Sequence, residues 1–133
     1  MDIRDIFRIG MVSSVNGANC TARVTFPDKE DMVSAELPIV VIGSYQTKGY
    51  WVPEVGMQVL CCFMPNPAGT GMNAGFILGG FYSDQHPPEE SDPNVRCLKV
   101  PDGSYIRFNG NGEVHIHASG HMILTAPRID LNP

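Results

Sequence analysis

The sequence predicts an all-β protein, a small barrel followed by an intertwined β-shaft, and three observations lead to this fold class. Fourteen glycines and eleven prolines in 133 residues favour short strands joined by frequent turns. No window shows a helical period of useful length. Residues 97–133 are patterned as short strands without a core of their own, and about forty residues cannot usually bury enough apolar surface to fold alone. Other copies of the same chain are the expected support for this segment.

Residues 8–83 are expected to form the barrel, after an N-terminal segment of residues 1–7. Five runs have the composition of strands, with a turn signal between successive runs: 8–15, 20–26, 37–42, 57–64 and 74–82. Five such strands suggest a small closed barrel. Alternation in the second run directs Ala22, Val24 and Phe26, or else the opposite set, toward the interior.

The fourth run, residues 57–64, is apolar on both of its faces. Cys61 and Cys62 are neighbours in it and are expected to point to opposite faces of the strand. One face must fill the barrel, so the other is expected to be buried by another subunit. The stretch 65–73 that follows is rich in Gly, Pro and Asn and is predicted to be a loop.

The second half of the chain begins with residues 84–96, which are acidic and rich in proline. That composition is typical of an extended, semi-stiff linker. The shaft of residues 97–133 follows, and turn-forming glycines separate most of its short runs. Its expected strands are 104–108, 113–118, 121–126 and 128–131. Three copies wound together would pair each strand edge with a neighbouring chain.

Charge and cysteine content exclude several classes of function. The formal net charge is -5, and an acidic chain is poorly placed to bind a phosphate backbone. None of the four cysteines forms a CxxC pair, so a zinc knuckle is not expected, and the chain is expected to be made in a reducing cytosol. The N-terminus lacks the apolar region of a signal peptide, and no stretch is long and apolar enough to span a bilayer.

Several stretches resemble, in the same order, the phage baseplate assembly protein V family, the central spikes of contractile tails. Similar segments occur in type VI secretion spikes and related injection systems. The stretches are 8–15, 23–27, 51–60, 75–83 and 102–106. Met57 departs from the pattern, because the family commonly has an acidic residue there. The resemblance implies an OB-fold barrel followed by a triple-stranded β-helix, assembled as a homotrimeric needle.

The resemblance also implies a function and a setting. The trimer would be the structural central spike of a contractile tail or injection-system baseplate, which pierces the target cell envelope. Its implied partners are the baseplate hub, the tail-tube proteins and the target envelope, with a separate tip-capping protein left open. The implied location is a virion or phage-tail-like particle, assembled in the cytoplasm of the producing cell.

His115 and His117 are the candidate metal ligands. Two residues apart on a strand, both imidazoles lie on one face, and a three-fold axis would bring six of them together in an octahedral set. The resemblance implies one iron ion per trimer at such a pair. The alternative is that the apolar face carrying Val114, Ile116 and Ala118 points inward and the histidines lie at the surface.

No enzyme activity is expected. The serines have no nucleophile-elbow context, and only the short linker stands where some spikes of the family carry a lysozyme-like insertion. The alternative function is a free-standing OB-fold module that binds nucleic acid through a basic groove and stacking aromatics. Nine Lys and Arg against fourteen Asp and Glu argue against that alternative.

Overall fold

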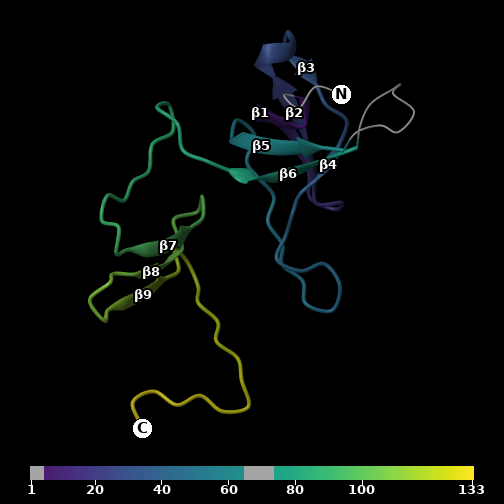
Figure 1. Cartoon of the computed structure of the whole chain (residues 1–133). Helices are drawn as coiled ribbons and strands as arrows, with labels where there is room; N and C mark the ends of the chain where they lie inside the picture. The colour runs from purple at the N-terminus through teal and green to yellow at the C-terminus, as the bar shows by residue number, and fades with distance from the viewer. Residues whose placement is uncertain (1–4, 65–73) are drawn as a thin grey trace. The chain divides into compact units, whose positions relative to one another are not determined.

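The computed structural model describes residues 5–64 and 74–133 of the chain, so the loop expected at 65–73 lies outside the described residues (Figure 1). The described part is all-β, with antiparallel sheets. The chain divides into two compact units, Met1–Pro87 and Pro88–Pro133. In the described part, no helix is both long and apolar enough to cross a bilayer.

The first unit is built around one sheet whose order is β3-β2-β1-β5-β6, with β4 also paired to β2. Its elements are β1 (Phe7–Asn16), β2 (Thr21–Phe26), the 3-10 helix η2 (Pro27–Lys29), β3 (Met32–Val33), β4 (Leu37–Pro38), β5 (Gln58–Phe63) and β6 (Gly75–Gly80). Four of the five predicted barrel strands are confirmed to within two residues at each end. They are the four longest strands in the described part of the unit.

The third predicted strand, residues 37–42, is correct only at its start, because β4 ends at Pro38. Proline has no amide hydrogen to continue a ladder. The next two amides change partner: Ile39 N donates to Cys20 O at 3.2 Å, and Val40 N donates to Ile77 O at 3.0 Å. A parallel bridge joins Ile39 to Ile77. The segment therefore connects β2 on one side to β6 on the other, and the sheet closes on itself.

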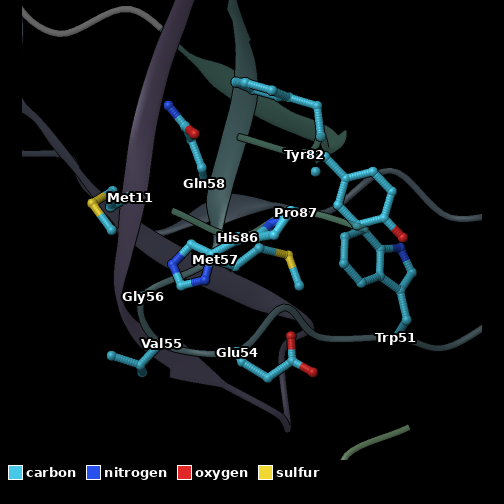
Figure 2. Close-up of a pocket in the computed structure, with 12 residues that line it drawn as sticks. Met11, Trp51, Glu54, Val55, Gly56, Met57, Gln58, Tyr82, His86 and Pro87 are labelled. Atoms are coloured by element: carbon cyan, nitrogen blue, oxygen red, sulfur yellow. The ribbon is translucent and has the colours of Figure 1, made fainter. Parts of the chain in front are cut away.

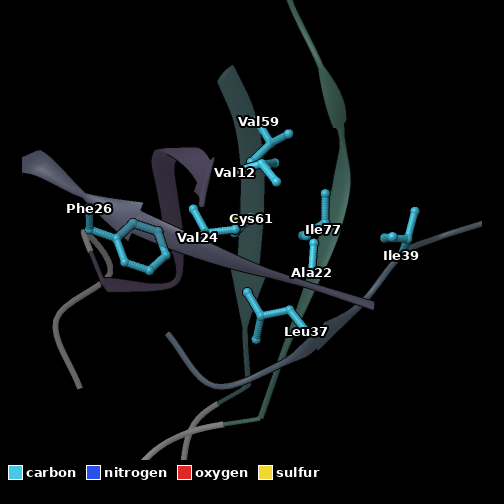
Figure 3. Packing of buried hydrophobic residues seen from close by; sticks show 9 residues of the cluster. All are labelled: Val12, Ala22, Val24, Phe26, Leu37, Ile39, Val59, Cys61 and Ile77. Carbon is cyan, nitrogen blue, oxygen red and sulfur yellow. The ribbon is translucent and has the colours of Figure 1, made fainter. Parts of the chain in front are cut away.

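The closed sheet encloses the core of the first unit (Figure 3). Its buried side chains are Val12, Ala22, Val24, Phe26, Leu37, Ile39, Val59, Cys61 and Ile77. The first of the two alternative inward sets predicted for β2 is therefore the correct one. Cys61 is buried whereas Cys62 is only partly covered, so the two neighbours point to opposite faces as predicted.

The second unit contains a three-stranded antiparallel sheet of β7 (Arg96–Lys99), β8 (Tyr105–Phe108) and β9 (Val114–His117), in that order. Its two hairpin turns contain the predicted glycines. Gly103, with φ of 93°, lies in one, and Gly110 and Gly112, with φ of 82° and 92°, lie in the other. Positive φ is inexpensive only for glycine, which explains these residues at these turns. β7 was not among the predicted strands.

The remainder of the second unit, residues 118–133, forms no strand in the structure, and Figure 1 shows it leaving the sheet as an extended trace. The runs 121–126 and 128–131 therefore make no β-pair within the chain. No residue from 88 to 133 is buried. The second unit thus has well-formed secondary structure and no core.

Candidate interaction surfaces

The three-stranded sheet of the second unit has one apolar face, formed by alternate residues of each strand. Leu98, Ile106 and Ile116 are directly opposite one another across the strands, and Phe108 lies between Val114 and Arg96, whose charge marks one end of this face. Their exposed fractions run from 44% for Ile106 to 70% for Leu98. A contiguous row of large apolar side chains left this open is typical of a surface that meets another protein.

The opposite face of this sheet is polar, and the start of the second unit covers part of it. Lys99 Nζ donates to Glu89 Oε2 at 2.9 Å. Arg107 donates to both carboxylate oxygens of Glu90, from Nε at 2.8 Å and from Nη2 at 2.9 Å. We call residues 88–95 the strap, because these contacts hold it against the sheet.

The sequence predicted residues 84–96 as an extended, semi-stiff linker, so the contacts of the strap with the sheet were not expected. The signal was present in the alternation of β7 and β8, which places Lys99 and Arg107 on one face. Recognising that these two side chains share a face requires knowing that β7 pairs with β8, and β7 was not predicted.

His115 and His117 share one face of β9, as their spacing predicted, and it is the polar face. His115 Nε2 contacts the Glu113 carboxylate, and the ring of His117 stacks on Tyr105 with centroids 5.2 Å apart. In the cross-strand register, His115 is opposite Arg107. Each ring therefore contacts a neighbouring side chain of the same chain. In the described ranges, no cluster of three or more His, Cys, Asp or Glu side chains is placed to hold a metal ion.

The first unit has an apolar outer surface across β1, β5 and β6. Phe7 is opposite Cys62, which is opposite Phe76, and Ile9 is opposite Leu60. Its exposed large side chains are Phe7, Ile9, Met11, Phe76 and Leu78. The run 57–64 is therefore apolar on both faces, as predicted, and its outward neighbours on β1 and β6 are apolar too.

Residues of the first unit line a cleft of about 720 Å³ (Figure 2). Aromatic and sulfur-containing side chains, including Met11, Trp51, Met57 and Tyr82, make up much of its lining. Trp51 packs against the core, and its Nε1 donates to Val40 O at 3.1 Å. The cleft lacks a cluster of titratable groups: Glu54 and His86 are the ionisable residues among its lining apart from Tyr82. Its chemistry suits an apolar contact better than catalysis.

Comparison with known proteins gives a distant relationship. No family profile matches the chain. The chain is similar to the spike protein of Escherichia phage P2, with 23% identity over 136 aligned residues that cover 94% of this chain. The aligned region spans 60% of the length of the phage protein. At this level of identity, the similarity supports a phage-spike-like protein and no finer assignment.

Proposed function

We propose that this chain is the structural central spike of a contractile tail or phage-tail-like injection system, and that it acts as a homotrimer. The observation that carries the proposal is the second unit, which has a regular sheet, no buried residue and an unpaired tail. A segment of this kind is completed by other copies of itself, as an intertwined shaft requires. The similarity to a phage spike protein supports the same conclusion.

The first unit would be an OB-fold barrel that anchors the spike. Its strands close through the bridge between Ile39 and Ile77, which is what a small five-stranded barrel needs. The exposed apolar surface over β1, β5 and β6 would then be buried by neighbouring subunits or by the baseplate. The hub and tail-tube proteins, and a tip-capping protein where one is present, would be the partners within the particle.

The second unit would be the triple-stranded β-helix that meets the target envelope. Its role is mechanical, because no chain of such a shaft can loosen without breaking its pairing to two others. No catalytic step is proposed, and the force would come from the contracting tail. The iron ion at His115 and His117 stays a prediction.

The mass of the purified chain in solution tests the proposal. Light scattering is expected to give about three times the 14.5 kDa of one chain, unchanged on dilution to low micromolar concentration. A folded monomer at that concentration would refute the proposal that the chain is a trimeric spike. Binding of single-stranded DNA that weakens with salt would instead support the alternative of a nucleic-acid-binding module.

A further inference from the structure

We infer that the apolar face of the β7-β8-β9 sheet is the surface that receives a second copy of this chain, specifically its residues 121–131. The histidine-bearing face would then point outward, under the strap. This inference rests on the proposed trimer and adds to it which face is buried and what buries it. An axial metal site at His115 and His117 is the alternative arrangement, and the experiments below separate the two.

The strap decides which face remains available. Glu89 and Glu90 are joined to Lys99 and Arg107 on the polar face by three hydrogen bonds of 2.8 to 2.9 Å. Arg107, which the strap contacts, and Tyr105, which stacks on His117, are only partly exposed, whereas Ile106 and Phe108 on the other face are exposed. Along β8, the polar side of the sheet is thus better covered than the apolar side. In a sheet that is stable by itself, the apolar face would be the covered one. Here the apolar face is left open for a partner.

The tail has the chemistry of the missing partner. Its exposed large apolar side chains are Met122, Ile123, Leu124, Ile129 and Leu131. The segment is extended, and no intrachain β-pair uses its backbone groups. The outer edges of β7 and β9 are likewise unpaired in the second unit. A tail from another copy can supply both apolar contacts to the open face and backbone hydrogen bonds to an open edge.

Adjacent positions of β7 allow a direct test, because Cys97 lies on the polar face and Leu98 on the apolar face. The purified full chain would be treated with a thiol-reactive maleimide, and modification would be read residue by residue by peptide mass spectrometry. The matched protein carries Cys97→Ser and Leu98→Cys, which moves the thiol by one residue to the other face. Each protein is compared with itself in denaturant.

In a trimer, Cys97 is expected to react almost as fast as it does in denaturant. A cysteine at position 98 is expected to react at least about tenfold more slowly than it does in denaturant. Protection of Cys97 together with a reactive cysteine at 98 would overturn the inference while leaving the trimer intact. A monomer would refute the proposed function itself. A monomer in which position 98 is protected would mean that the chain's own tail folds back on the sheet.

A second pair of variants covers the case in which Leu98→Cys prevents assembly. Ile116→Asn and His117→Asn place the same side chain on opposite faces of β9. The first is expected to dissociate the trimer, and the second to leave its mass unchanged. The reverse pattern would overturn the inference, as would one metal ion per three chains that is lost in His117→Asn.

Discussion

At the scale of single residues, the most informative contacts are those between the strap and the sheet. Arg107 holds Glu90 through a two-pronged contact, and Lys99 holds Glu89 through one hydrogen bond. Sequence spacing could place His115 and His117 on one face, because that needs only the two-residue period of a strand. It could not bring Glu90, 17 residues distant, to Arg107, because that contact depends on the path of the chain before β7.

The first prediction concerns the titration of Glu90. The hydrogen bond from Arg107 holds the pKa of the Glu90 carboxyl below its ordinary value of 4.5, and the positive charge of Arg107 adds to this effect. A carboxyl whose pKa is lowered by folding contributes stability above its unfolded pKa, and that contribution is lost as pH falls through the folded pKa. The ion pair between Glu90 and Arg107 should therefore persist through mildly acidic pH and be lost only in stronger acid.

The measurement is an NMR titration of the Glu90 side-chain carboxyl in the full chain. Arg107→Gln serves as the comparison, since it keeps a hydrogen-bond donor but removes the charge and the two-pronged geometry. The pKa of Glu90 is expected to rise in this variant. A Glu90 that titrates at its ordinary value in the unmodified protein would show that the strap is not held by Arg107.

At the scale of elements, turn chemistry and strand alternation predicted most of the first unit. Long alternating runs bounded by Gly, Pro and Asn gave β1, β2, β5 and β6, and the inward set on β2 was among the alternatives. The third run was predicted too long, because its apolar composition does not reveal that Ile39 and Val40 bond to different strands. β7 was missed because its residues, Arg-Cys-Leu-Lys, include no β-branched or aromatic side chain.

Gly10 gives the second prediction, because it lets β1 and β2 approach closely. A methyl group there would lie 2.4 Å from Val24 Cγ1 and 2.6 Å from the Thr25 carbonyl oxygen. Gly10→Ala must therefore displace a core side chain and a strand backbone, at a cost of about 1–3 kcal/mol in the free energy of unfolding. Gly79→Ala is the matched control on β6, where a methyl group would meet no atom within 4 Å.

Chemical denaturation of the two variants measures the difference. Gly79→Ala should unfold at nearly the same denaturant concentration as the unmodified protein, or slightly later, because alanine restricts the unfolded chain. Gly10→Ala should unfold clearly earlier. Equal midpoints for the two variants would mean that the strands can separate at Gly10 without loss of packing.

At the scale of the whole molecule, the two units differ in how they are stabilised. The described part of the first unit has a cluster of nine buried hydrophobic side chains around a closed sheet, whereas the second unit has no buried residue. The sequence predicted this contrast, because strand-like runs of so short a segment cannot enclose a core. Which face of the second unit meets a partner could not be predicted from the sequence. Either the histidine face or the apolar face of β9 could point inward, and the contacts of the strap with the sheet are not visible in the sequence.

The third prediction concerns the tail and the stability of the assembly. A chain that ends at Gly120 lacks the five exposed apolar side chains of the tail, each worth roughly 1.5–3 kcal/mol when fully buried. It is expected to keep a folded first unit and to dissociate from trimer to monomer on dilution, whereas the full chain stays trimeric.

The full chain carrying Arg128→Gln and Asp130→Asn is the control. These changes remove only an exposed ion pair of 3.0 Å, which contributes little, so its mass should not change. Sedimentation over a range of concentrations measures all three proteins. If the truncated chain stays as firmly trimeric as the whole, the clamp between copies lies in the outer surface of β1, β5 and β6 and not in the tail.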